Sequence, residues 1–142
     1  MALMIHWPPN VVNDKDPRLS SVRMMSILPY LGNPHHDLKN IFHVTGTNGK
    51  GSVCKYIESI CLASGFSVGL YTSPHIHRFN ERIVLNNNEI SDNDLYFYTE
   101  KVRNVCEYLK IEPSIFEVST LVMLLYFQAK SPDVNIIEVG MG

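Results

Sequence analysis

A glycine-rich turn is the feature of this 142-residue chain that is best equipped for chemistry. Thr45-Gly46-Thr47-Asn48-Gly49-Lys50-Gly51-Ser52 stands between an apolar run, residues 41–44, and a helix-like run, residues 53–64. Glycines let the backbone approach an anion closely, and a helix N-terminus adds unpaired N–H groups and the positive end of a dipole. Lys50 supplies a mobile cation, and Ser52 supplies a hydroxyl suited to magnesium. The turn therefore predicts a phosphate-binding loop.

The spacing of this turn differs from the two common patterns for such loops. The Walker pattern requires four residues between Gly and Gly-Lys-Ser/Thr, whereas only two residues separate Gly46 from Gly49, and a further glycine precedes Ser52. A dinucleotide fingerprint would require a third glycine where Cys54 stands. The alternative is a β-to-α turn without a ligand, but such a turn does not need Lys50 or Ser52.

An acidic residue near the end of a later apolar run is the second candidate. Residues 134–139 form a predicted strand, and Glu138 lies close to its carboxyl end. Ligands of open parallel sheets collect at that edge, and a carboxylate there can hold magnesium directly or through water. A solvent-facing glutamate at a strand end is the alternative.

Strands alternate with helices along the chain, which indicates an α/β layered fold. Because the first two strands flank one short helix, we expect them to pair in parallel. A hairpin or flap is expected over residues 83–90, and Met24-Met25 is expected in the core. The predicted strands are residues 41–45 (buried), 67–71 and 134–139; the predicted helices begin at Pro17, Ser52, Ser91 and Pro113-Ser114.

Composition indicates one soluble domain, since 45% of the residues are hydrophobic and 18% are charged. A net charge of −2 and the absence of a Lys/Arg run argue against a nucleic-acid partner. No apolar stretch approaches ~20 residues, so we expect no membrane span. The three cysteines lack zinc-ligand spacing and a targeting signal is missing, so we expect reduced thiols and a cytoplasmic protein. Residues 1–15 are predicted to be an irregular leader.

The glycine-rich turn resembles the ATP loop of the folate branch of the Mur ligase superfamily, which comprises dihydrofolate synthases and folylpolyglutamate synthases. The resemblance runs from about Leu19 to the last residue, because three further segments agree in order and spacing. It implies an α/β, parallel-sheet P-loop-type nucleotide-binding domain of Mur-ligase kind, incomplete at the C-terminus. These segments are Tyr71-Thr72-Ser73-Pro74-His75, Phe116-Glu117-Val118-Ser119-Thr120 and Ile137-Glu138-Val139-Gly140-Met141-Gly142.

The resemblance also assigns roles around ATP and Mg²⁺. Lys50 is implied to be catalytic, and Ser73 and Glu138 are implied to hold the magnesium ion at the ATP phosphates. His75 would orient the loop. From sequence alone, Ser73 is an ordinary turn serine before proline. The implied ATP-binding residues are Gly46, Thr47, Asn48, Gly49, Lys50, Gly51 and Ser52.

Three further residues are implied to bind substrate. Phe116 would stack on a pterin ring, and Glu117 would accept hydrogen bonds from the pterin amino and imino groups. Arg82 would hold the substrate or its own loop. From sequence alone, Phe116 is most often a core residue, and Glu117 is favoured by the helix dipole. The segment Asn80-Glu81-Arg82 is equally well interpreted as a solvated salt-bridge pair.

The implied activity is an ATP-dependent ligase, a dihydrofolate synthase that joins L-glutamate to dihydropteroate through an acyl phosphate. Folylpolyglutamate synthase, which acts on a folate, is the nearest alternative; an inactive remnant or interaction protein is another. A peptidoglycan Mur ligase would carry a further domain before the ATP loop, and only 45 residues precede Gly46. Because relatives continue beyond Gly142 into a glutamate-binding domain, we expect a truncated ATP-binding domain that is inactive alone and monomeric at full length.

Overall fold

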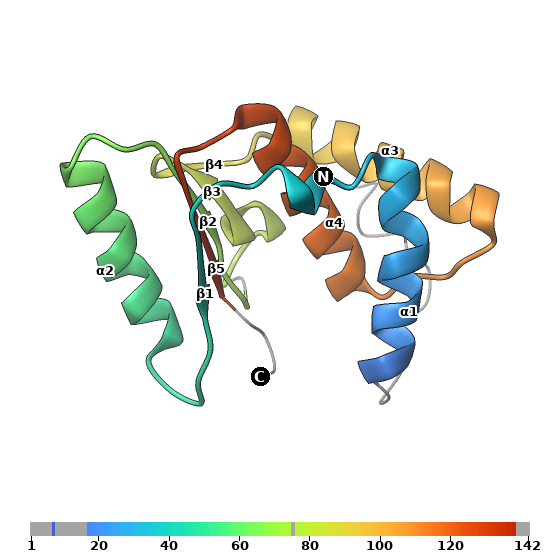
Figure 1. The fold of residues 1–142 in the computed structure, drawn as a ribbon, viewed down its shortest axis with the longest axis horizontal. Helices are drawn as coiled ribbons and strands as arrows, with labels where there is room; N and C mark the ends of the chain where they lie inside the picture. Colours follow the sequence, from blue (N-terminus) through green and yellow to red (C-terminus); the bar gives the residue numbers. More distant parts are fainter. Residues whose placement is uncertain (1–6, 8–16, 75, 139–142) are drawn as a thin grey trace. The chain divides into compact units, whose positions relative to one another are not determined.

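The computed structural model describes residue 7 and residues 17–74 and 76–138, which divide into two compact units (Figure 1). The helical unit is drawn from Met1–Asp37 and Asp92–Gln128, and the sheet unit from Leu38–Ser91 and Ala129–Gly142. Each unit therefore combines two stretches of the chain. The predicted leader, residues 1–15, lies outside the described residues apart from Trp7.

A five-stranded sheet forms the centre of the sheet unit, with the strand order β1-β5-β2-β3-β4. The first three strands in this order are parallel, and β3 and β4 extend the sheet as an antiparallel hairpin. This confirms the predicted α/β class and the flap over residues 83–90. The strands are β1 Ile41–Val44, β2 Val68–Tyr71, β3 Ile83–Leu85, β4 Asn88–Glu89 and β5 Val134–Glu138.

The position of β5 corrects two expectations about the first strand. β1 and β2 were expected to pair, but β5 lies between them and pairs with both. β1 is consequently an edge strand, and Ile41 and Phe42 are 49% and 45% exposed instead of buried. β5 takes the central position instead, with Val134, Asn135 and Ile136 all buried.

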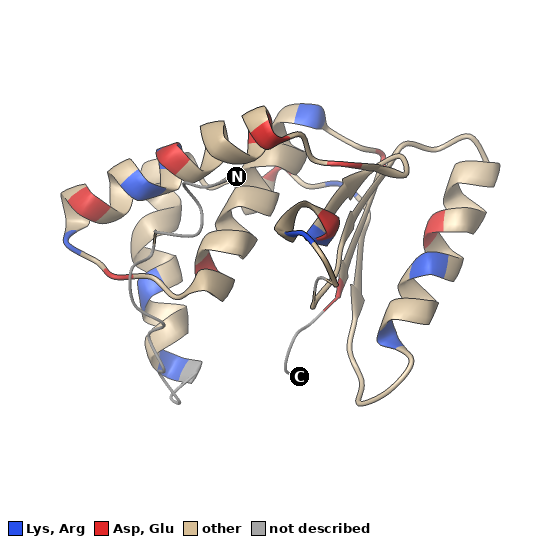
Figure 2. Ribbon diagram, turned by 180° about the vertical axis from the view of Figure 1, so that it is seen from behind, with Lys and Arg blue, Asp and Glu red and all other residues tan. Residues whose placement is uncertain are grey.

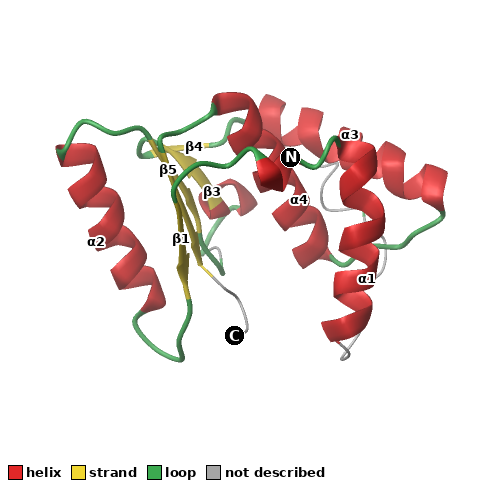
Figure 3. Ribbon diagram, viewed as in Figure 1, coloured by secondary structure: helices red, strands yellow, loops and turns green. Residues whose placement is uncertain are grey.

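Helix α2, Lys50–Ala63, covers one face of the three parallel strands (Figures 1 and 3). Cys54 is buried against Leu70 and Ile136 in the core of this unit. The helix ends before Gly65, whose φ of +86° is the left-handed conformation that glycine adopts at helix ends. The helix predicted over residues 52–64 is thus confirmed, beginning two residues earlier.

In its described residues, the helical unit contains three α-helices and two short 3₁₀ segments. Helix α4 is buried on most sides, as its apolar sequence predicts, and residues 121–127 are all buried. Met25 is 67% exposed, so the expected core position of Met24-Met25 is wrong for Met25. The elements are α1 Pro17–Ile27, η1 Leu28–Leu31, η2 Pro34–His36, α3 Asp92–Leu109 and α4 Ile115–Lys130, whose last two residues belong to the sheet unit.

Charged residues of both signs lie along the same helices (Figure 2). On α3, for example, Arg103 lies 3.5 Å from Glu100 and 3.0 Å from Glu107. Mixed charge of this kind is typical of a solvated helix face. Within the described part of the chain, we find no helix with the length and apolar character that crossing a membrane requires.

Candidate functional site

The glycine-rich turn adopts the backbone conformations that its glycines permit. Gly46 has a φ of +147° and Gly49 a φ of +76°, both in the region where a Cβ atom is unfavourable. Gly49 is the N-cap of α2 and makes no side-chain capping hydrogen bond, and the first turn of the helix carries no acidic residue. The positive end of the α2 dipole is therefore not neutralised by a carboxylate of its own first turn.

Lys50 is the first residue of α2 and its stem lies next to the turn. A side chain at Gly46 would begin 3.8 Å from the Cγ atom of Lys50, so the lysine passes close to the glycine backbone. Residues 45–49 are exposed. The loop thus presents backbone amides, one cation and a helix N-terminus to solvent, which is the equipment for binding a phosphate.

The parallel strands bring the other candidate residues to the same edge of the sheet. Val44 at the end of β1 pairs in register with Glu138 at the end of β5, and Tyr71 at the end of β2 pairs with Ile137. The phosphate loop follows Val44 directly, and Ser73 follows Tyr71 by two residues. Three separate stretches of sequence therefore meet at the carboxyl edge of the sheet, where open α/β sheets bind ligands.

Ser73 and Glu138 are in direct contact. The backbone N–H of Ser73 donates to Oε2 of Glu138 over 3.0 Å. Glu138 is only 5% exposed, and it forms no ion pair with any residue that the structure describes. A carboxylate withdrawn from water without a cation is unfavourable unless a further positive group is bound.

The thiol of Cys54 is close enough to Glu138 to be influenced by its charge, but it is not an ionised metal ligand. Burial raises the pKa of the Cys54 thiol, and the negative charge of Glu138 raises it further, so Cys54 stays a neutral thiol. We find no group of three His, Cys, Asp or Glu side chains suited to a metal in the described part of the chain. A serine hydroxyl and one carboxylate nevertheless fit magnesium, which binds one or two carboxylates and completes its coordination with phosphate and water.

Arg82 belongs to the loop that follows β2. Its carbonyl oxygen accepts a hydrogen bond from the N–H of Thr72 over 3.0 Å, and its guanidinium lies 5.4 Å from the centre of the Phe79 ring. The backbone of Arg82 thus helps to close the loop, while the role of its side chain stays a prediction. His75 lies outside the described residues.

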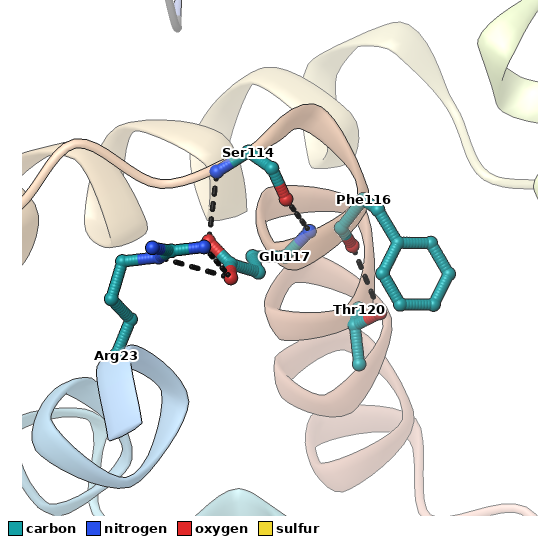
Figure 4. Close-up of polar contacts among 5 residues, drawn as sticks. All are labelled: Arg23, Ser114, Phe116, Glu117 and Thr120. Carbon is teal, nitrogen blue, oxygen red and sulfur yellow. Dashed lines mark hydrogen bonds and ion pairs between the residues drawn. The ribbon is translucent and has the colours of Figure 1, made fainter. Parts of the chain in front are cut away.

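Phe116 and Glu117 lie in the first turn of helix α4, in the helical unit, and point in different directions (Figure 4). Phe116 is 44% exposed, whereas Glu117 is 1% exposed. The Glu117 carboxylate accepts hydrogen bonds from Nη2 of Arg23 over 2.8 Å and from Nε over 3.1 Å. It also accepts the N–H of Ser114 over 2.8 Å, while Ser114 Oγ accepts the N–H of Glu117 over 3.2 Å. This reciprocal pair is a capping box.

These contacts differ from the pterin pairing that was predicted for Glu117. Burial alone would raise the pKa of Glu117, but hydrogen bonds from Arg23, Ser20 and Ser114 outweigh burial and hold the pKa below its ordinary value. A pterin edge would have to compete with Arg23 for this carboxylate. Sequence reasoning missed Arg23 because it lies 94 residues away, although Ser114-x-x-Glu117 is a visible capping-box signal.

The fold and the edge site together define an α/β protein with a mostly parallel sheet and a glycine-rich turn at the carboxyl edge of that sheet. Comparison with known proteins narrows this class, although no protein-family model matches the chain. The folylpolyglutamate synthase of Lacticaseibacillus casei is 41% identical over 143 residues, covering 97% of this chain and 32% of the relative. The dihydrofolate synthase/folylpolyglutamate synthase of Bacillus subtilis is 38% identical over 125 residues, covering 84% of this chain and 29% of the relative.

Solved structures agree with these relatives. A structure described as an FPGS–AMPPCP–folate complex matches with a TM-score of 0.84 and 39% identity, covering 99% of this chain and 34% of that one. The chain belongs to the folate branch of the Mur ligase superfamily and corresponds to the N-terminal part of its members. It spans about a third of the length of the curated relatives named above, at 32% and 29%.

Proposed function

We propose that the chain is the ATP-binding part of a dihydrofolate synthase, a ligase that joins L-glutamate to dihydropteroate with consumption of ATP. The observation that carries the proposal is the meeting of the phosphate loop, Ser73 and Glu138 at one sheet edge. A relative with an AMPPCP–folate complex supports the nucleotide and the folate class of substrate. In this proposal, ATP phosphorylates the benzoate-type carboxylate of dihydropteroate, and the amine of glutamate then displaces the phosphate.

The residues of the sheet edge divide the work of phosphoryl transfer. The amides of residues 46–52 and the ammonium of Lys50 bind the phosphates and offset their negative charge. Ser73 and Glu138 would hold Mg²⁺, which neutralises charge on the phosphate oxygens when bound. Positioning and electrostatic stabilisation account for most of what such a transfer needs from a protein.

Phe116 is the residue that best fits a pterin in the helical unit. Phe116 is 44% exposed at the first turn of α4, so its side chain is accessible for stacking. Glu117 would join the pterin site only by sharing its carboxylate between the ligand and Arg23. We therefore assign stacking on the pterin ring to Phe116.

Folylpolyglutamate synthase is the second candidate, because the Lacticaseibacillus casei relative carries that name alone. The two activities share ATP and glutamate and differ in whether the acceptor already carries glutamate. Titrating the chain with dihydropteroate and, separately, with tetrahydrofolate distinguishes them. We expect tighter binding of dihydropteroate; a clear preference for tetrahydrofolate would move the chain to the second candidate.

Turnover is the test of whether the ATP-binding part acts alone. We expect the chain to bind ATP with Mg²⁺ but to form no dihydrofolate from dihydropteroate and glutamate, since it spans only 32% of a relative. Dihydrofolate formed by the chain without another polypeptide would contradict this part of the proposal. A chain that binds no nucleotide would instead favour the reading as an interaction protein.

A further inference from the structure

Glu81 binds three consecutive backbone amides in the loop that follows β2. Its Oε2 atom accepts the N–H of Ile76, and its Oε1 atom accepts the N–H groups of His77 and Arg78, each over 2.8 Å. Successive N–H groups that converge on one point form an anion-binding turn. Here the chain fills that turn with its own carboxylate, so these amides are not available to an external phosphate.

The residue after Glu81 closes the base of the same loop. The carbonyl oxygen of Arg82 accepts the N–H of Thr72 over 3.0 Å. Ser73 lies between the two anchored segments, since Thr72 precedes it and Ile76 follows it by three residues. Both flanks of Ser73 are therefore tied to one short helical segment, η3 Phe79–Arg82.

Glu81 keeps its negative charge, and therefore its three hydrogen bonds to the loop amides, over a wide range of pH. Hydrogen bonds from the backbone amides of Ile76, Arg78 and His77 lower the pKa of Glu81 to about 2. The carboxylate is thus ionised at any pH suitable for binding measurements, and each of its three contacts is charge-assisted.

An ion pair made by the same loop has a different geometry. The guanidinium of Arg78 pairs with the carboxylate of Glu89, the last residue of β4. This contact orients the Arg78 side chain, whereas Glu81 holds the backbone. Glu89 therefore provides a matched control, since its loss removes one carboxylate that contacts the loop but leaves the three amides bound to Glu81.

We propose that Glu81 is a positioning residue for the Mg²⁺ site: by bracing residues 76–78, it fixes Ser73 beside Glu138. This inference rests on the proposed function, which assigns Ser73 and Glu138 to the metal. Magnesium demands near-ideal octahedral geometry, so a displaced serine hydroxyl is a poor ligand. Mutation of a side chain that supports a metal ligand commonly lowers the metal affinity about tenfold to hundredfold.

Glu81→Gln tests the proposal, because it keeps the length of the side chain and replaces one acceptor oxygen with a donor. With AMPPCP bound, we expect the Mg²⁺ affinity of this variant to fall about tenfold. AMPPCP affinity measured in EDTA should stay unchanged, and Glu89→Gln should change neither affinity. Glu81→Asp keeps the charge but shortens the reach, and we expect the same loss of Mg²⁺ affinity.

Two results would overturn the role of Glu81. One is an unchanged Mg²⁺ affinity in both Glu81 variants. The other is an equal loss of Mg²⁺ affinity in Glu89→Gln, which would mean that any disturbance of the loop lowers Mg²⁺ affinity. Wild-type protein is titrated first. If it binds no Mg²⁺–AMPPCP, the proposed function fails; if it binds and the Glu81 variants bind Mg²⁺ equally well, only the role of Glu81 fails.

Discussion

Glu138 of the sheet unit and Glu117 of the helical unit are both buried, at 5% and 1% exposure, yet their surroundings differ. Glu117 is enclosed by donors, with Arg23, Ser20 and Ser114 all bonded to its carboxylate. Glu138 accepts the N–H of Ser73 and has no ion pair with a described residue. One carboxylate is satisfied by the protein, and the other retains acceptor capacity at an edge that the phosphate loop shares.

This difference separates a structural carboxylate from one that can serve a ligand. A buried charge is stable only when other groups compensate it. Arg23 compensates Glu117 within the fold, so this pair ties α1 to α4. For Glu138, a bound metal ion would supply the positive charge that offsets the buried carboxylate. A carboxylate that needs such a cation is suited to a metal-binding site.

Removing the carboxylate of Glu117 should have the largest effect. Glu117→Ala takes away the partner of a mostly buried Arg23 and the capping box of α4, so we expect the free energy of unfolding to fall by about 3 kcal/mol. Urea denaturation measures this. Glu107→Ala, which removes an exposed partner of Arg103 on α3, is the control and should change stability little. An equally small change for Glu117→Ala would show that the pair is not structural.

Loss of the Lys50 ammonium should have the next largest effect, on binding instead of stability. We expect Lys50→Ala to lower the affinity for Mg²⁺–ATP by about 10²-fold, or ~2.7 kcal/mol, because a cation at the phosphates is lost. Isothermal titration calorimetry measures the affinity. Lys55→Ala, on the same helix and paired with Glu58, is the control. Near-normal binding by Lys50→Ala would remove the phosphate-loop assignment.

Glu138→Gln should have a smaller and more selective effect. Glutamine keeps an oxygen for the N–H of Ser73 but lacks the charge that attracts a metal ion. We expect the Mg²⁺ affinity of the nucleotide complex to fall about tenfold, while nucleotide affinity in EDTA is retained. The exposed Glu112→Gln serves as the comparison. Equal Mg²⁺ affinity in Glu138→Gln and wild-type protein would exclude Glu138 as a ligand.

Acid should weaken the Arg23–Glu117 pair gradually. Because the pKa of Glu117 in the folded protein lies below the ordinary value of 4.5, its contribution is present above about pH 4.5 and is lost as the pH falls through the folded pKa. The difference in unfolding free energy between wild-type protein and Glu117→Gln should therefore shrink with falling pH. A difference that stays constant between about pH 6 and pH 3 would contradict the lowered pKa.

Local sequence patterns were sufficient where a single stretch of chain decides the structure. Gly46 and Gly49 take positive φ values as their turn requires, and α2 begins at Lys50. The hairpin over residues 83–90 also followed from sequence, with Asn86 and Asn87 in the left-handed conformation at its turn.

Long-range pairing was the part that sequence could not provide. The insertion of β5 between β1 and β2 depends on contacts between strands far apart in the sequence, and no local sequence pattern near β1 predicts it. Arg23 is likewise 94 residues from Glu117. Glu81 was part of a visible Asn-Glu-Arg segment, but its three amide partners depend on how the loop folds back.

The central claim is that the phosphate loop, Ser73 and Glu138 form one site for a metal–nucleotide complex. Paramagnetic broadening of backbone amide signals by Mn²⁺–AMPPCP tests this in one NMR experiment. We expect the amides of Gly46, Gly49, Gly51 and Ser73 to broaden first, and those of Leu62 and Ala63, at the other end of α2, to remain sharp. Broadening that misses Ser73, or that is confined to residues outside the edge of the sheet, would contradict the account.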